Sequence, residues 1–423
     1  MNTSDDQQSE SISEHFSSGH ESNEVNAQSA EVSSEDKTSV RKNSLEVLND
    51  PSPYAPRLPK RRHKSRPNWY LIAVVVALLI GWALYTFAWP AIYQSIRVYL
   101  QPSRAKFEKG LEWPVRELYH TCEYLAVIWF FYLGASIGSF FNVLAGRLPE
   151  GRGVVLGGSK CPFCQTRLSF RDNIPIFGWL SCKGRCSTCK LPIAPRYLLI
   201  ELLVGSLFVL IASRELFSGG ANLPRFNVLV YAGIIWTVFY PKWYLIGAFV
   251  YHAMFFATLV MLAVADLEKS KFPWRAVAFF GGLFAVVKIV QVDLNFLRWF
   301  DWLPLAAPDL SPLVNAVITV AVGGLVGWLF GLAAFRLFPP YVLEKSRIHW
   351  LQVSILVGIV LGWQAVIITG LCTFLMTWFS ILLAPVRTKY PSQLFFGILV
   401  STILVHHMFW RQIDSIIKPL VQR

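Results

Sequence analysis

Apolar residues occur in this chain as long, nearly unbroken stretches that alternate with short polar segments. A transmembrane helix needs about 20 predominantly apolar residues, so stretches of this kind predict helices that cross a bilayer. The stretch at 351–383 is long enough for a tight helical hairpin. The pattern therefore predicts an all-α polytopic membrane protein. The apolar stretches lie at residues 69–93, 122–144, 197–212, 243–265, 276–290, 313–335, 351–383 and 394–410.

Composition and charge indicate that a lipid bilayer is a partner of this protein. Hydrophobic residues make up 54% of the 423 residues and the mean hydropathy is +0.44, which is more apolar surface than a soluble fold normally buries. The formal net charge of +13 gathers beside the apolar stretches and in the loops between them. Cytoplasmic loops of membrane proteins carry such an excess of Lys and Arg, so we expect no nucleic-acid partner.

The N-terminal part of the chain divides into three segments by composition. Residues 1–56 are rich in Ser, Glu, Asp and Gln and predict a disordered polar tail. Residues 57–117 contain the basic flank RLPKRRHKSR, an apolar stretch too long for a signal peptide, and a linker, which together predict an additional transmembrane anchor. This anchor would hold the tail in the cytoplasm, and the span within 118–149 would then return the chain to the cytoplasmic side.

The polar loop at residues 150–196 contains five cysteines between two apolar stretches. Two Cys-x-x-Cys pairs are separated by 21 residues, just beyond the usual spacing of a zinc ribbon. Each pair can direct both thiolates at one ion, so we expect a small cytoplasmic loop domain folded around a structural Zn²⁺. Reduced loop cysteines or disulfides are the alternatives, and a cytoplasmic location disfavours disulfides. The expected ligands are Cys161, Cys164, Cys186 and Cys189, with Cys182 as an alternate.

Asp266 is expected at the same side of the membrane as the cysteine loop. Residues 226–240 are apolar, but about 15 residues are short for a full crossing, so we interpret them as interfacial or re-entrant. The stretch at 243–265 then returns to the cytoplasmic side and ends at Asp266. A carboxylate followed by Lys269 and Lys271 is also typical of an exposed ion pair.

Several short motifs occur in an order that is typical of one family. They are GASIGSFFNVLAGRLP at 134–149, a Cys-Pro-x-Cys pair, Asp-Asn-Ile-Pro at 172–175, Gly-Arg-Cys-x-x-Cys at 184–189, and PRYLLIELL. Over about residues 118–410 the chain resembles the prepilin peptidases, also called type IV leader peptidases. The resemblance implies a first family span at 118–149, a zinc module at 150–196 and a polytopic aspartic-peptidase-like membrane domain at 197–423.

The family resemblance also implies an activity and a location. Its members are similar in being aspartic endopeptidases of the bacterial inner membrane that remove the basic leaders of prepilins and pseudopilins at the cytoplasmic face. They serve type IV pilus and type II secretion assemblies, and many then methylate the new N-terminus with S-adenosylmethionine. The chain has no glycine-rich nucleotide fingerprint, so S-adenosylmethionine is implied by the resemblance alone.

The resemblance supplies one catalytic carboxylate and leaves the second without a match. An aspartic peptidase needs two carboxylates around one water molecule, one acting as base and one as acid. Asp266 in VADLEKSKFP matches the first family Asp. Aligning LVGIVLGW at 356–363 with the family puts Trp350 at the second Asp and His349 at the glycine before it. An indole neither ionises nor acts as an acid or base, so the peptidase activity stays open at this point.

Other polar residues are candidates for the missing group. Glu344 is the carboxylate nearest in sequence to Trp350, the position expected for the second Asp. Interfacial glutamates beside lysines are, however, commonly solvated anchors. His349 could polarise a carbonyl or bind a metal. Asp301 and Asp309 belong to a loop that we expect on the opposite face.

Glu201 lies four positions into an apolar stretch and is a further candidate. A carboxylate there is costly, so it should have a partner, either Arg196 or Arg185, or contact the substrate.

Two functions follow from the sequence as a whole. The chain is either an active prepilin peptidase-like endopeptidase, or a catalytically inactive pseudo-peptidase that acts as a binding or scaffold protein in a pilus or secretion assembly.

Overall fold

A computed structural model describes residue 112 and residues 115–422, apart from 152, 154–158, 162, 227–236, 238, 268–273, 304–309, 338–346 and 384–390. The expected tail and N-terminal anchor, Glu344, Asp309 and most of 226–240 therefore lie outside the described residues.

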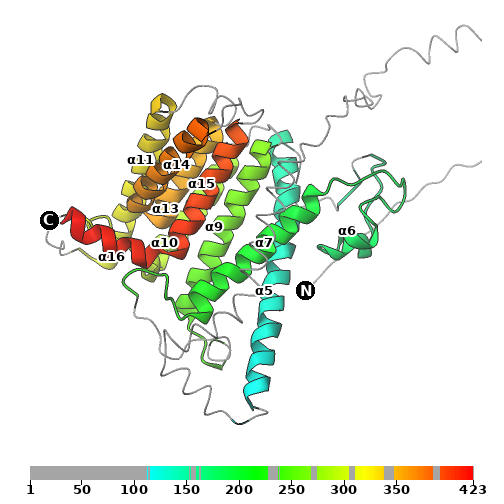
Figure 1. The fold of residues 1–423 in the computed structure, drawn as a ribbon, viewed down its shortest axis with the longest axis horizontal. Helices are drawn as coiled ribbons and strands as arrows, with labels where there is room; N and C mark the ends of the chain where they lie inside the picture. The colour runs from blue at the N-terminus through cyan, green and yellow to red at the C-terminus, as the bar shows by residue number, and fades with distance from the viewer. Residues whose placement is uncertain are drawn as a thin grey trace, which may run out of the picture. The chain divides into compact units, whose positions relative to one another are not determined.

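The described part of the chain is helical and contains no β-strand (Figure 1). This agrees with the predicted all-α fold. The long helices are α5 Val115–Arg147, α7 Arg196–Ala212, α9 Trp243–Leu267, α10 Trp274–Val290, α11 Pro312–Leu337, α13 Arg347–Leu361, α14 Trp363–Leu383, α15 Pro391–Met408 and α16 Trp410–Val421. The short ones are η2 Leu148–Glu150, η3 Arg171–Asn173, α6 Phe177–Ser181, the π-helical turn η4 Ser213–Phe217, and η5 Val292–Leu294.

Five of these helical segments are long and apolar enough to cross a membrane, which confirms a polytopic helical membrane protein. Helix α13 and helix α15 contain shorter apolar segments. The predicted hairpin within 351–383 is present as α13 and α14, which are separated by Gly362 at a φ of 97°. The candidate spans are Leu125–Glu150, Arg196–Phe217, Trp243–Asp266, Pro312–Leu337 and Trp363–Ser380.

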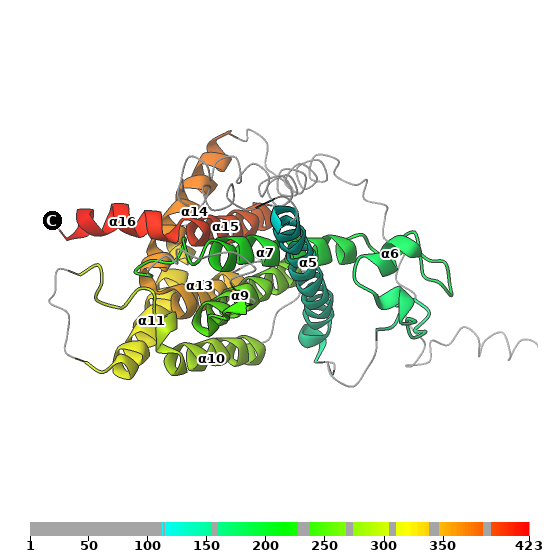
Figure 2. The same cartoon turned by 90° about the horizontal axis from the view of Figure 1, so that it is seen from below.

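Successive long helices of the bundle run in alternating directions, which gathers particular helix termini at each end (Figures 1 and 2). Helix α5 packs along α7 and also contacts α9, while α11 packs along α13. The ends of α5 and α9 and the starts of α7 and α13 therefore lie at one end of the bundle, which we call the Asp266 end. The cysteine loop joins α5 to α7, so it leaves and re-enters the bundle at this end.

Glycine lets α11 and α13 approach until their backbones touch. A Cβ atom added to Gly323 would lie 2.0 Å from the Gly358 carbonyl oxygen, and one added to Gly327 would lie 2.2 Å from the Ser354 oxygen. The glycines of α11 that face α13 recur every four residues, the small-residue spacing that brings membrane helices close together. This contact fixes α13, and with it His349, relative to the rest of the bundle.

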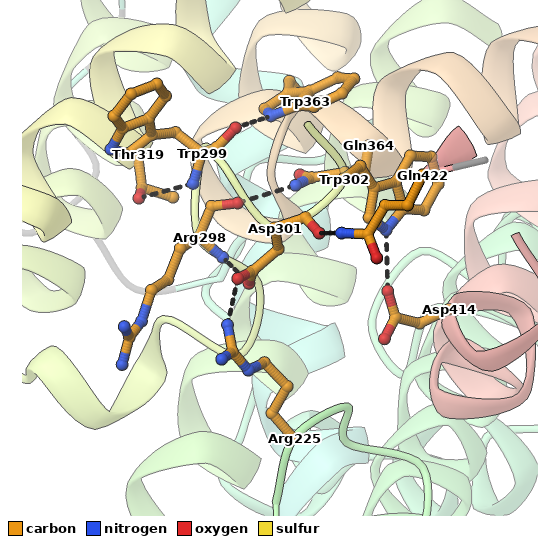
Figure 3. A network of polar contacts seen from close by, with 10 residues as sticks. All are labelled: Arg225, Arg298, Trp299, Asp301, Trp302, Thr319, Trp363, Gln364, Asp414 and Gln422. Atoms are coloured by element: carbon orange, nitrogen blue, oxygen red, sulfur yellow. Dashed lines mark hydrogen bonds and ion pairs between the residues drawn. The ribbon is translucent and has the colours of Figure 1, made fainter. Parts of the chain in front are cut away.

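The opposite end of the bundle is closed by a polar network around Asp301 (Figure 3). The Asp301 carboxylate pairs with the Arg225 guanidinium and accepts a 2.6 Å hydrogen bond from the Arg298 amide. Trp363 Nε1 donates to the Trp299 carbonyl at 2.9 Å, which ties this loop to the start of α14. Asp301 is buried and paired, so it has a structural role at the end away from Asp266.

Candidate functional site

The two Cys-x-x-Cys pairs lie in two similar tight turns. In the first turn the Gln165 amide donates to the Cys161 carbonyl at 3.0 Å, and in the second the Lys190 amide donates to the Cys186 carbonyl at 3.0 Å. Gln165 and Lys190 both have a positive φ, 56° and 57°, which turns the chain sharply after each pair. Each turn is closed by a short antiparallel bridge. This local geometry directs two sulfurs of each turn to the same side.

The four sulfurs form a group whose dimensions fit a tetrahedral zinc ion. All four lie within 4.8 Å of one another, with Cys161 Sγ 3.8 Å from Cys189 Sγ and Cys164 Sγ 3.9 Å from Cys186 Sγ. Four thiolates at about 2.3 Å from zinc would be separated by about 3.8 Å. Hydrogen bonds with Thr166 lower the pKa of Cys164 to about 6. The cluster can hold a metal ion as the spacing predicts.

Cys182, which was expected as an alternate ligand, lies outside this group of four sulfurs. Its thiol donates to Asp172 Oδ1 at 3.1 Å, and Ser187 Oγ donates to Asp172 Oδ2 at 2.7 Å. These two hydrogen bonds lower the pKa of Asp172, and the same carboxylate raises the pKa of Cys182. Cys182 therefore remains protonated and ties η3 to the end of α6, while Ser187 ties η3 to the second cysteine turn.

Glu201 anchors the cysteine loop to α7. Its Oε2 accepts a 2.6 Å hydrogen bond from the amide of Ile176, and the residue is only 8% exposed. Ile176 has a φ of 66°, an unusual value for a β-branched residue that needs support from its surroundings. The partner of Glu201, expected to be Arg196 or Arg185, is thus a backbone amide, and the contact fixes the loop.

Replacing Glu201 with alanine is expected to loosen the segment around Ile176, because a buried amide loses its charged acceptor. Hydrogen bonds to charged groups contribute about 1.5–3 kcal/mol, so cleavage near residues 172–181 in limited proteolysis should rise roughly tenfold or more. Ser206→Ala, which removes only a hydrogen bond within α7, is the matched control. Equal proteolysis of the Glu201→Ala variant and the control would show that this contact does not hold the loop.

A polar pocket of about 390 Å³ lies between α5, the cysteine loop and the start of α7. Its volume falls in the range of small-molecule sites. Charged and aromatic side chains from all three segments face it, and α5 lies between this loop and the remaining helices (Figures 1 and 2). The residues that matter here are Asn142, Arg147, Asp172, Trp179, Tyr197 and Glu201.

Asp266 meets a histidine at the Asp266 end of the bundle. Its Oδ1 lies 3.0 Å from Nδ1 of His349, in the first turn of α13, and both side chains are almost fully buried. The next residue, Trp350, is 1% exposed and packs against Phe330 with ring centroids 6.2 Å apart. The fold thus brings His349 and Trp350 close to Asp266. Trp350 is the position that the alignment matched to the second catalytic Asp.

Three buried polar residues at the other end of the bundle were not singled out from the sequence. Glu215 of η4, His252 of α9 and His407 of α15 lie together inside the apolar helices. Ionisable residues within apolar spans are rare and usually functional. The positions of these three residues in apolar stretches could therefore have marked them as candidate functional residues from the sequence alone.

Comparison with known proteins relates the chain to one family. The family model of the Bacterial Peptidase A24 N-terminal domain matches residues 132–214, which include the cysteine loop and Glu201. No solved structure matches the chain.

Several similar proteins carry the name prepilin leader peptidase/N-methyltransferase. That of Klebsiella pneumoniae is 48% identical over 86 residues, 19% of this chain and 38% of the relative. That of Dickeya chrysanthemi is 30% identical over 257 residues, 55% of this chain and 74% of the relative. That of Aeromonas salmonicida is 27% identical over 305 residues, 66% of this chain and 88% of the relative.

The extent of the similarity differs between relatives. Three relatives that match this chain at 40–48% identity are covered over only 25%, 38% and 35% of their own length. The two longer matches cover 55% and 66% of this chain. The chain is a prepilin peptidase-like membrane protein and belongs to the prepilin leader peptidase/N-methyltransferase family.

Proposed function

We propose that the protein binds the leader segment of prepilin- or pseudopilin-like substrates at the Asp266 end and hydrolyses a peptide bond there. Asp266 and His349 would be the catalytic residues. The observation that carries the proposal is their 3.0 Å contact at the end of α9, where the family resemblance expects the first catalytic carboxylate. Two carboxylates of an aspartic peptidase share a proton at a similar separation.

An aspartate and a histidine can divide the work that two carboxylates normally share. The ionised Asp266 takes a proton from a water molecule, whose oxygen adds to the carbonyl carbon of the scissile bond. Protonated His349 polarises the carbonyl oxygen and then donates its proton to the leaving nitrogen as the C–N bond breaks. The proton on Asp266 afterwards returns to the imidazole, so the pair ends as it began.

We further propose that the Asp266 end faces the cytoplasm in the bacterial inner membrane. The cysteine loop carries many basic residues, and such loops remain on the cytoplasmic side. The N-terminal tail would lie on that side as well. Zn²⁺ bound by Cys161, Cys164, Cys186 and Cys189 would have a structural role, because four thiolates leave no open coordination position.

Methyl transfer is a second proposed activity, favoured by the polar pocket beside the cysteine loop. S-adenosylmethionine would supply an activated methyl group. In the pocket, the rings of Trp179 and Tyr197 can stack on an adenine, and the carboxylate of Asp172 can compensate a sulfonium charge. Binding of S-adenosylmethionine to the purified protein, weakened by Trp179→Ala and unchanged by Trp274→Ala, would support this site.

The peptidase proposal is tested by incubating the purified full-length protein in detergent with a prepilin-type peptide. We expect one cleavage, identified by the masses of the two products, directly after the basic leader. Asp293→Asn, which alters an exposed carboxylate of η5, should cleave as the wild type does. A peptide that binds and stays intact would contradict the proposal and would favour the pseudo-peptidase, a binding or scaffold protein.

A further inference from the structure

A second group of metal-ligating side chains lies far from the cysteine loop and from Asp266. It consists of Glu215, His252 and His407, each of which is 0% exposed. One ligand atom from each lies within 4.8 Å of the others. His252 and Asp266 are separated by about 14 residues of one helix, or ~21 Å at 1.5 Å per residue, so this group is independent of the proposed catalytic pair.

The polar atoms of this group are poorly satisfied by hydrogen bonds. Nδ1 of His252 lies 2.7 Å from Glu215 Oε1, and Nε2 of His407 lies 2.9 Å from the same oxygen but without the angle of a hydrogen bond. Glu215 Oε2, His252 Nε2 and both ring nitrogens of His407 have no hydrogen-bond partner among the described residues. Buried polar atoms are nearly always paired, so this many unpaired atoms in one group require another explanation.

The donor set is typical of a divalent transition metal. Two imidazole nitrogens and one carboxylate bind zinc in many proteins, and the same set binds non-haem iron. A cation bound by one ligand atom of each residue would compensate a carboxylate buried among apolar helices. A π-helical turn is frequent at functional sites, and η4 is the turn that carries Glu215.

Aromatic side chains surround the group and separate it from water. The His252 ring lies 5.8 Å from that of Phe296, and the His407 ring lies 5.3 Å from Phe256 and 5.9 Å from Trp410. The three ligands come from elements that are distant in sequence. A metal here would join η4, α9 and α15 at the end of the bundle opposite to Asp266.

We propose that Glu215, His252 and His407 bind a divalent transition-metal ion, with zinc as the probe, that links these three elements. The test is the metal content of the full-length protein, purified in detergent with zinc and without chelator, by mass spectrometry. We expect two equivalents in the wild type and in His406→Ala, which alters the neighbouring buried histidine. We expect one in His407→Ala and one in Cys161→Ser/Cys164→Ser.

X-ray absorption of the wild type adds a measurement that does not depend on a folded variant. Zinc held only by thiolates gives one shell near about 2.3 Å, whereas a second site with nitrogen and oxygen ligands adds a shell near about 2.0–2.1 Å. A mixed shell would support the proposal. A sulfur-only shell, a single equivalent that the cysteine variant loses, or equal zinc in His407→Ala and His406→Ala would overturn it.

Discussion

Replacing Cys161 and Cys164 with serine is expected to release one zinc ion per chain and to unfold the loop from 159 to 193. The loop lacks a core of its own, since Phe163, Phe170 and Phe177 are more than half exposed. Its folding would therefore depend on metal binding, which contributes about 10–16 kcal/mol in small zinc modules. The bundle should stay folded, because its helices bury a separate apolar core.

Zinc analysis and limited proteolysis measure the two effects of this cysteine variant, and far-UV circular dichroism reports the bundle. The matched control is Cys122→Ser/Cys372→Ser, which changes two cysteines outside the cluster. A loop that keeps its zinc or its resistance to protease in the Cys161→Ser/Cys164→Ser variant would show that the four sulfurs do not form the metal site.

Replacing His349 with glutamine is expected to lower the rate of leader cleavage by about 10²–10⁴-fold, the usual contribution of a general acid or base. Glutamine can hydrogen-bond to Asp266 but cannot deliver a proton. His349→Asp should retain more activity than His349→Gln, because it places a second carboxylate next to Asp266 and recreates the usual pair. The measurement is the initial rate on a prepilin-type peptide under saturating conditions.

The control for the His349 variants is His406→Gln, a buried histidine at the opposite end of the bundle. It should cleave at the wild-type rate. If His349→Gln and His406→Gln cleave equally fast, His349 does not take part in proton transfer, and the second acid must be sought elsewhere, with Glu344 as the first candidate.

Features set by neighbouring residues were predictable from the sequence. The apolar stretches predicted the helices, and the one at 351–383 predicted the α13–α14 hairpin, whose turn depends on Gly362. The two Cys-x-x-Cys pairs predicted the cluster of four sulfurs, because each turn needs only local hydrogen bonds.

Contacts between distant residues were not predictable in the same way. His349 and Asp266 are 83 residues apart, and their contact depends on how closely α11 and α13 pack through glycine. The partner of Glu201 is a backbone amide, which no pattern of side chains reveals. The Glu215 group requires three elements to meet, and a lone histidine in an apolar helix does not indicate which residue it faces.

The most direct test of the proposed function is the cleavage rate of the Asp266→Asn variant compared with wild type and with Glu344→Gln. Asparagine keeps the size of the side chain and a hydrogen-bond acceptor for His349, but it cannot accept a proton from water. We predict that Asp266→Asn loses cleavage while still binding the peptide, and that Glu344→Gln cleaves at the wild-type rate. Cleavage by Asp266→Asn at the wild-type rate would contradict a catalytic role for the Asp266–His349 pair.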